Sequence, residues 1–179
     1  MNVYLSGMIG SGKSTLGARL AARLGRPFHD LDRELERIIG RSFHDLVRDE
    51  GWLAFREVEY RVCKEFAALR EAVCALGGGT VRYQWNLDAL RETGVLVFLD
   101  ADLATLAARV RAADRPRVNP GASLEEDLER IWRVSADCYR TTADLVYRTD
   151  TGRSVEQEVE DLAALLRVRG VPPGESRRG

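Results

Sequence analysis

The sequence predicts an α/β fold built around a parallel sheet. Short apolar runs suited to strands alternate along the chain with longer segments in which apolar residues recur at helical spacing. Three of these runs are followed by Gly or Asp and then by a helical segment, which is the order of a βα unit. A chain of 179 residues has the length of one domain with an ordinary core.

These patterns predict five strands and six helices. The strands are expected at Asn2–Leu5, around Phe28 and His29, at Ala72–Leu76, at Gly94–Leu99 and at Leu145–Tyr147. The helices are expected at Lys13–Leu24, Arg33–Ile39, Trp52–Leu69, Leu103–Arg111, Leu124–Tyr139 and Val155–Val168. Ser123 begins the fifth helix with a capping box, because Glu126 stands three residues after it.

The segment between Ala112 and Ala122 is rich in arginine and turn-forming residues, and its two prolines prevent a helix from continuing through it. A loop of this length in a compact domain is typical of an active-site lid, which we place at about residues 112–123. From Gly170 the chain has no apolar periodicity, so residues 170–179 are expected to be a disordered tail. Residues 1–169 then form a single domain without an internal repeat or a linker.

Composition argues against several classes of function. A formal net charge of −1 offers no field of one sign for nucleic acid or for an anionic membrane. The cysteines Cys63, Cys74 and Cys138 are too few and too scattered for a disulfide framework or a zinc site. The N-terminus lacks a signal-peptide pattern, and no apolar run approaches the roughly 18 residues that span a bilayer. We expect a cytoplasmic monomer whose partner is a small molecule, with no nucleic acid and no membrane.

A phosphate-binding loop follows the first predicted strand. Its residues Gly7-Met8-Ile9-Gly10-Ser11-Gly12-Lys13-Ser14 match the pattern G-x-x-x-x-G-K-[ST] directly before a predicted helix. Glycines let the backbone N–H groups turn toward phosphates, and the helix N-terminus adds positive potential. Lys13 supplies a mobile cation for the β- and γ-phosphate oxygens, and the Ser14 hydroxyl suits Mg²⁺. The predicted ATP-binding residues are Gly10, Ser11, Gly12, Lys13, Ser14 and Thr15; the alternative is an ordinary glycine-rich turn.

Two aspartates, Asp30 and Asp32, follow the second predicted strand. At positions i and i+2 of an extended segment their carboxylates point to the same side, toward the crevice at the carboxyl ends of parallel strands. One can hold Mg²⁺ through water while the other accepts a hydrogen bond from a substrate hydroxyl. The alternative is that Asp32 only caps the next helix.

Four motifs occur in a fixed order along the chain. They are the loop GMIGSGKST, the pair DLD, the run Glu50-Gly51-Trp52-Leu53-Ala54-Phe55-Arg56-Glu57-Val58-Glu59 and the triplet Gly77-Gly78-Gly79. Together they closely resemble the shikimate kinase family, from Val3 to about Leu166. The resemblance implies a three-layer α/β/α P-loop kinase fold with a five-stranded parallel sheet, a helical substrate-binding region at about residues 31–60 and a lid. It also implies transfer of the γ-phosphoryl group of ATP, with Mg²⁺, to the 3-hydroxyl of shikimate in aromatic amino-acid biosynthesis.

The resemblance assigns roles to individual residues. It makes Lys13 the phosphate cation, Asp32 the acceptor-binding base and Arg115 the lid arginine over the transferring phosphoryl group, so these three are the catalytic residues. It makes Ser14 and Asp30 the Mg²⁺-site residues. It adds Arg109, Arg115 and Arg153 to the ATP-binding residues, Arg109 and Arg153 flanking the adenine. It implies a substrate-binding set of Asp32, Arg56, Gly77, Gly78 and Gly79, with Glu59 holding Arg56 in place.

The residue types suit these roles, although each also fits a structural one. A guanidinium fork can bind both oxygens of a carboxylate, but Arg56 and Glu59 at a spacing of three also fit a solvated helix face. The triplet Gly77–Gly79 fits a tight turn, but three glycines exceed what a turn needs and favour close approach of backbone to a ligand. Arg115 fits either a plain loop charge or a cation that closes over the γ-phosphate.

The chain departs from the family pattern at Ser135. Family members carry a second arginine for the substrate carboxylate in R-x-x-L-Y, and the position four residues before Tyr139 is Ser135. Arg133 stands two residues earlier, roughly 200° around a helix. Either the register slips so that Arg133 or Arg140 reaches the site, or one carboxylate contact is missing.

Three functions are therefore compared. The first is a shikimate kinase. The second is a kinase of the same fold that acts on another small hydroxy acid or polyol, for which Ser135 is the only support. The third is a nucleotide-binding homologue without catalysis, which the intact set Lys13, Ser14, Asp30, Asp32 and Arg115 argues against.

Overall fold

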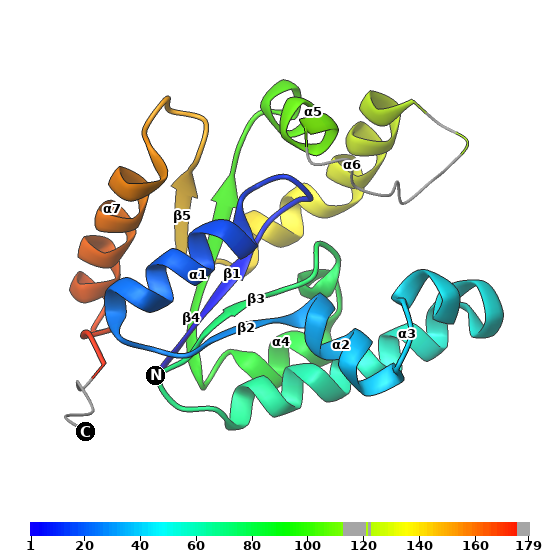
Figure 1. The fold of residues 1–179 in the computed structure, drawn as a ribbon, viewed down its shortest axis with the longest axis horizontal. Coiled ribbons are helices and arrows are strands. Elements are labelled where there is room, and N and C mark those ends of the chain that lie inside the picture. Colours follow the sequence, from blue (N-terminus) through cyan, green and yellow to red (C-terminus); the bar gives the residue numbers. More distant parts are fainter. Residues whose placement is uncertain (113–120, 122, 175–179) are drawn as a thin grey trace.

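The structure, a computed structural model, describes residues 1–112, 121 and 123–174. Within these residues, five strands form one parallel sheet in the order β2-β3-β1-β4-β5 (Figure 1). The strands are β1 (Asn2–Ser6), β2 (Phe28–Asp30), β3 (Val73–Ala75), β4 (Gly94–Asp100) and β5 (Leu145–Arg148). The predicted five-stranded parallel sheet is confirmed.

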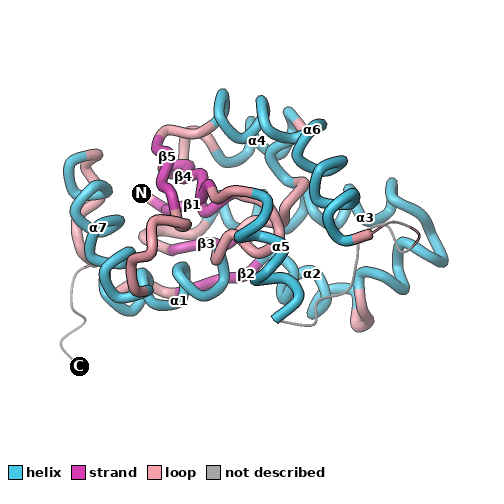
Figure 2. The backbone as a smooth tube through the Cα atoms, turned by 90° about the horizontal axis from the view of Figure 1, so that it is seen from above, coloured by secondary structure: helices cyan, strands magenta, loops and turns pink. Residues whose placement is uncertain are grey.

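Helices cover both faces of this sheet. They are α1 (Lys13–Leu24), α2 (Leu31–Ile39), α3 (Phe43–Ala68), α4 (Gln84–Leu90), α5 (Leu103–Ala112), α6 (Leu124–Thr142) and α7 (Val155–Val168), with a 3₁₀ turn η1 at Thr80–Arg82. Figure 2 shows α1 and α7 on one side of the strands and α4 and α6 on the other. The three-layer α/β/α arrangement is therefore also confirmed.

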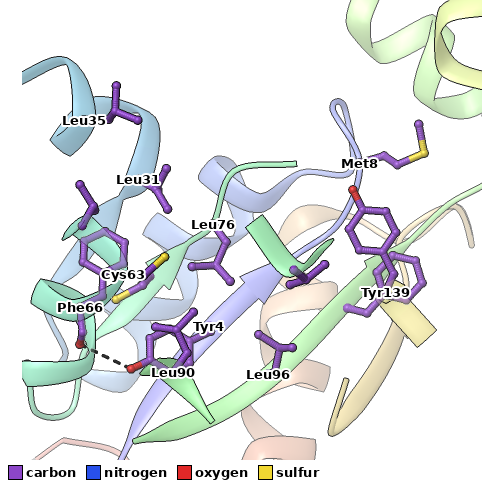
Figure 3. Packing of buried hydrophobic residues seen from close by; sticks show 14 of the residues in the cluster. Tyr4, Met8, Leu31, Leu35, Cys63, Phe66, Leu76, Leu90, Leu96 and Tyr139 are labelled. Atoms are coloured by element: carbon purple, nitrogen blue, oxygen red, sulfur yellow. Dashed lines mark hydrogen bonds between the residues drawn. The ribbon is translucent and has the colours of Figure 1, made fainter. Parts of the chain in front are cut away.

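Alternation along the strands builds a core on each face. Val3 and Leu5 of β1 join the cluster beneath α1 and α7, whereas Tyr4 between them joins the cluster beneath α3, α4 and α6. This is the period-two alternation of a strand that is buried on both sides. Figure 3 shows the second cluster, where the Tyr4 hydroxyl also donates to the carbonyl of Phe66 at 3.4 Å.

The helix starts in the substrate-binding region differ from the prediction. α2 begins at Leu31, because Asp30 accepts a 3.2 Å hydrogen bond from the Asp32 N–H and caps it. α3 begins at Phe43 rather than Trp52, and Ser42 caps it by accepting from the Asp45 N–H at 3.1 Å. Gly51 interrupts α3 with a φ of 84°, so only the second half carries a continuous helical pattern in the sequence. The segments η1 and α4 were not predicted.

The chain remains ordered past the expected domain boundary. Val171 is fully buried, and the Gly174 N–H donates to the carbonyl of Leu24 at 2.6 Å. Arg26 also holds this segment, through a 2.5 Å hydrogen bond to the carbonyl of Pro172. The expectation of a disordered tail from Gly170 is therefore wrong for residues 170–174, because one apolar residue and backbone hydrogen bonds dock them on α1.

Two predictions fall outside the described residues: the remaining tail at 175–179, and the lid with its Arg115, since residues 113–120 and 122 are not described. The predicted capping box at the start of α6 is present, with Ser123 and Glu126 each accepting from the other's backbone N–H. Among the described helices, none combines the length and the apolar composition needed to cross a membrane.

Candidate active site

A pocket of about 670 Å³ lies at the carboxyl ends of the central strands. Residues at or shortly after the ends of β1, β2 and β3 line it, among them Ile9, Asp30 and Leu76, as expected for a ligand site in an open parallel sheet. The pocket brings together most of the predicted site residues. Those that line it are Gly10, Ser11, Gly12, Lys13, Ser14, Thr15, Asp30, Asp32, Arg56, Gly77, Gly78, Gly79 and Arg109.

The phosphate loop curls because its glycines adopt conformations that other residues avoid. Gly10 and Gly12 have φ angles of 83° and 96°. Gly12 stands at the N-cap of α1 without a capping side chain, so the first N–H groups of that helix face the loop without such a partner. The Lys13 ammonium group donates to the carbonyls of Gly7 and Met8 at 2.8 and 2.9 Å. The loop thus presents helix N–H groups and a lysine to the pocket, a combination suited to phosphate.

The Ser14 hydroxyl and the Asp30 carboxylate lie next to each other in the pocket. Ser14 Oγ donates a 2.6 Å hydrogen bond to Asp30 Oδ2, while Asp30 Oδ1 caps α2. The alternative in which Asp32 caps this helix is therefore wrong. Asp32 lies in the first turn of α2, not on an extended segment, and its side chain remains open to the pocket.

The Asp32 side chain is exposed where it faces the pocket. On its other sides it lies against protein and near the carboxylates of Asp30 and Glu59. Desolvation by the surrounding protein raises the pKa of its carboxyl group above the ordinary value, and the charge of Asp30 raises it further. The ammonium of Lys13 opposes this shift, and Glu59 adds a smaller increase. A carboxylate in these surroundings is a stronger base than an ordinary aspartate.

Arg56 and Glu59 form a buried ion pair at the other end of the pocket. Arg56 Nη1 donates to Glu59 Oε2 at 2.8 Å, and the two side chains are only 11% and 1% exposed. Glu59 also accepts hydrogen bonds from the Thr80 hydroxyl at 2.8 Å and from the Asn86 amide at 3.2 Å. The solvated helix face considered for this pair is therefore wrong, and Glu59 fixes the arginine in the pocket wall.

Aromatic rings complete the surroundings of this arginine. The guanidinium carbon of Arg56 lies 4.7 Å from the ring centre of Phe55, 4.5 Å from that of Tyr83 and 5.4 Å from that of Trp52. Trp52 is nearly half exposed and lines the pocket, although its residue type alone suggests a packing role.

The glycine triplet lets side chains approach the backbone closely. A Cβ on Gly77 would lie 3.1 Å from the Thr80 hydroxyl, and one on Gly79 would lie only 2.8 Å from a guanidinium nitrogen of Arg82. The carbonyl of Gly78 accepts a short hydrogen bond from the Tyr139 hydroxyl. Glycine at positions 77 and 79 therefore leaves room for the ends of the Thr80 and Arg82 side chains beside the backbone.

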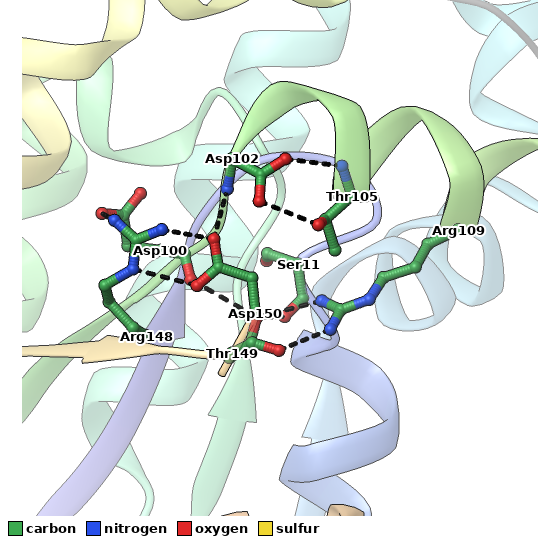
Figure 4. A network of polar contacts seen from close by, with 8 residues as sticks. All are labelled: Ser11, Asp100, Asp102, Thr105, Arg109, Arg148, Thr149 and Asp150. Carbon is green, nitrogen blue, oxygen red and sulfur yellow. Dashed lines mark hydrogen bonds and ion pairs between the residues drawn. The ribbon is translucent and has the colours of Figure 1, made fainter. Parts of the chain in front are cut away.

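Arg109 lies at the phosphate-loop end of the pocket. It donates to the Thr149 carbonyl at 2.5 Å and hydroxyl at 3.0 Å, and it reaches the Gly10 carbonyl at 3.5 Å. Figure 4 shows this guanidinium turned toward Thr149 and the backbone of Ser11. Arg153 instead pairs with Asp161 and does not line the described pocket, so the structure does not bring the two predicted adenine-flanking arginines together.

Ser135, where the sequence departs from the family pattern, lies on α6. α6 is a continuous helix, and Ser135 is fully buried on it without lining the pocket. Arg133 is exposed, and Arg140 lies over the ring of Trp132 at 5.0 Å. The possibility that a local slip brings either arginine into the site is therefore wrong.

Sequence reasoning missed several residues that build the pocket. Three of them lie on η1 and α4: Thr80, Arg82 and Asn86. The fourth is Tyr139 on α6, to which the sequence analysis assigns no role in the pocket. The signal available for Arg82 was a cation three residues after the glycine triplet.

Comparisons with known proteins agree with this geometry. Residues 9–166 match the family model described as shikimate kinase. A shikimate kinase from Nitratidesulfovibrio vulgaris is 39% identical over 168 residues, covering 92% of this chain and 94% of the relative. The structure of a shikimate kinase from Acinetobacter baumannii in complex with shikimate has a TM-score of 0.84 and 30% identity, covering 94% of each chain. That of a shikimate kinase from Bacteroides thetaiotaomicron has a TM-score of 0.85 and 29% identity, covering 93% of this chain and 98% of the other. The chain belongs to the shikimate kinase family.

Proposed function

We propose that this chain is a shikimate kinase that transfers the γ-phosphoryl group of ATP to the 3-hydroxyl of shikimate. The observation that carries the proposal is the position of the Arg56–Glu59 pair in the same pocket as the phosphate loop and Asp32. An arginine fixed at one end of a pocket, with a phosphate loop at the other, suits an acceptor that carries both a carboxylate and a hydroxyl.

The nucleotide end fits ATP with Mg²⁺. The phosphate loop and the start of α1 offer N–H groups to the phosphates, and Lys13 is within the same wall. Ser14 and Asp30 offer two adjacent hard oxygen atoms, the ligand type that Mg²⁺ prefers. The described residues contain no group of three or more His, Cys, Asp or Glu side chains that could hold a metal. Mg²⁺ would therefore depend on phosphate oxygens and water as well as on Ser14 and Asp30.

The acceptor end supplies orientation and a base. The guanidinium of Arg56 binds the acceptor carboxylate and directs the hydroxyl toward Asp32, which accepts its proton as the oxygen attacks the γ-phosphorus. The raised pKa of Asp32 favours this transfer. The chain's contribution is positioning and charge stabilisation, so no covalent enzyme intermediate is required. Arg115 is proposed to act over the transferring group, and Arg109 at the nucleotide end.

The proposal also includes action as a monomer in the cytoplasm.

The test is ADP release by the purified protein with ATP and Mg²⁺. Shikimate is compared with a panel of other hydroxy acids and polyols and with no acceptor, and the product is identified by mass. Turnover with shikimate well above every other acceptor supports the proposal. Preference for another acid or polyol would favour the related kinase, and the absence of turnover with the whole panel would favour a homologue without catalysis.

A further inference from the structure

Two guanidinium groups converge at Gly79. A Cβ built on this residue would lie 2.8 Å from Nη2 of Arg82 and 3.2 Å from Nη2 of Arg56. Arg56 comes from α3 and Arg82 from η1, and both line the pocket. Two cations thus approach the same point of the pocket wall from different elements.

The charges at this point are incompletely balanced by the protein. Glu59 pairs with Arg56, but within the described part of the chain the side chain of Arg82 makes no hydrogen bond or ion pair. Its Nε atom is buried without a partner, and its only ring contact is with Tyr83 at 6.0 Å. Glu59 is already shared by Arg56, Thr80 and Asn86, so among the described residues Arg82 is the guanidinium of this set without a carboxylate partner. Arg82 is half-buried, and a half-buried cation without a counter-ion is unfavourable, which points to an anionic ligand.

α6 contributes no cation to the point where Arg56 and Arg82 converge. The helix packs against η1, and the charge of Arg82 acts on the Tyr139 hydroxyl. Ser135, one turn before Tyr139, is a fully buried residue whose hydroxyl has no hydrogen-bond partner among the residues that the structure describes. The side of α6 near η1 therefore supplies no cation of its own, and Arg82 supplies one from the facing element.

We propose that Arg82, together with Arg56, forms a two-arginine site for the carboxylate of the acceptor, and that Arg82 takes the part which an arginine at position 135 would otherwise have. The inference rests on the proposed function, because the carboxylate is that of shikimate. Two guanidinium forks can each donate to a carboxylate oxygen, so removal of one weakens binding without abolishing it. Arg82 is thus a determinant of acceptor specificity.

The experiment measures dissociation constants by titration calorimetry for shikimate and for its primary amide, which has the same ring and hydroxyls but no negative charge. Arg82→Met should weaken shikimate binding by roughly tenfold to a hundredfold, the loss expected for a charge-assisted hydrogen bond. Affinity for the amide should change less than twofold. The KM for ATP should stay unchanged, because the nucleotide occupies the other end of the pocket.

Matched variants separate this role from packing. Arg133→Met removes an exposed arginine from α6 and should leave both affinities unchanged. Arg82→Lys keeps the charge but loses the fork, so its shikimate affinity should lie between those of the wild type and Arg82→Met. If Arg82→Met does not fold, as judged by its thermal transition, the affinities for shikimate and for the amide are compared in Arg82→Lys instead.

Equal loss of affinity for acid and amide would overturn the inference, because it would mean that Arg82 only shapes the pocket. An unchanged affinity for shikimate would overturn it as well. In both cases wild-type turnover with shikimate would still support the proposed function. Failure of the wild type to phosphorylate shikimate would instead remove the proposed function, and the inference would fall with it.

Discussion

Glu59 Oε2 accepts a 2.8 Å hydrogen bond from Arg56 Nη1, three residues earlier on α3, where the glutamate side chain is 1% exposed. The same carboxylate also accepts from Thr80 and Asn86. It therefore joins Arg56, an arginine of the pocket lining, to η1 and α4, two elements that shape the pocket wall. A single buried charge sets both the local fold and the direction of Arg56.

Replacement of Glu59 should affect stability and acceptor binding together. Glu59→Ala leaves Arg56, Thr80 and Asn86 without their common acceptor, so the free energy of unfolding should fall by about 3–5 kcal/mol. Glu59→Gln keeps the shape and can still bond all three groups, since the Thr80 hydroxyl can accept from an amide, so its stability loss should be smaller. Both variants should raise the KM for shikimate. Urea unfolding and steady-state kinetics provide the measurements, and equal stability of the two variants would contradict the assigned role.

The phosphate-loop lysine has a natural control, because the chain contains only two lysines, Lys13 and Lys64. Lys13→Met should lower kcat by about 10²–10³-fold, the effect of removing one donor to the charge that develops in the transition state. Lys64 lies on α3 over the Tyr60 ring, outside the pocket, and Lys64→Met should leave kcat unchanged. Near-normal turnover of a folded Lys13→Met protein would remove the phosphate-loop argument.

The parts of this molecule that depend on local sequence could be predicted. The five strands are short apolar runs in a βα order, and none of their observed bounds differs from the predicted one by more than one residue. α1 and α7 match their predicted ranges because the apolar spacing is regular and the following Gly or preceding Ser marks an end. The phosphate loop was found because its glycines and lysine are contiguous.

The wall opposite the phosphate loop could not be predicted in the same way. The first half of α3 was missed because Gly51 breaks the periodicity, and α4 was missed because it is short and its N-cap residue, Tyr83, provides no side-chain cap. The contacts of Glu59 with Thr80 and Asn86 join residues 21 and 27 positions apart. Such pairings follow from the packing of α3 on α4, which no local pattern specifies.

The thiols offer a test of the core. Burial raises the pKa of Cys74 to about 12 and that of Cys63 well above its usual range, so both stay protonated and unreactive at neutral pH. Cys138 is only half-buried. A thiol reagent at pH 8 should therefore modify about one of the three cysteines in the folded protein and all three in urea. Rapid modification of Cys63 or Cys74 in the native state, located by peptide mass mapping, would contradict the packing described here.

Asp32 should set the acidic side of the pH profile. The groups that face it are the carboxylates of Asp30, Glu36 and Glu59 and the ammonium of Lys13, and its pKa is raised chiefly by desolvation and by Asp30. A base with a raised pKa becomes protonated at a higher pH than an ordinary aspartate, near 3.9. kcat/KM for shikimate should therefore fall on the acidic side with a midpoint above that value. Asp32→Asn should lower kcat by about 10²–10⁴-fold with little change in nucleotide affinity, and the residual activity should lose this acidic limb.

The same shift makes a prediction about stability that does not depend on catalysis. Because the folded state disfavours the charged form of Asp32, its ionisation costs stability at neutral pH, and the cost disappears as the pH falls from the folded pKa toward the unfolded one. Asp32→Asn should therefore be more stable than the wild type at pH 7 in the absence of Mg²⁺ and nucleotide. The difference should narrow as the pH approaches 4. Urea unfolding of both proteins across this range provides the measurement. A variant that is less stable than the wild type at pH 7 would show that favourable contacts stabilise the charged form of Asp32. The raised pKa, and with it the argument that Asp32 is a strong base, would then be contradicted.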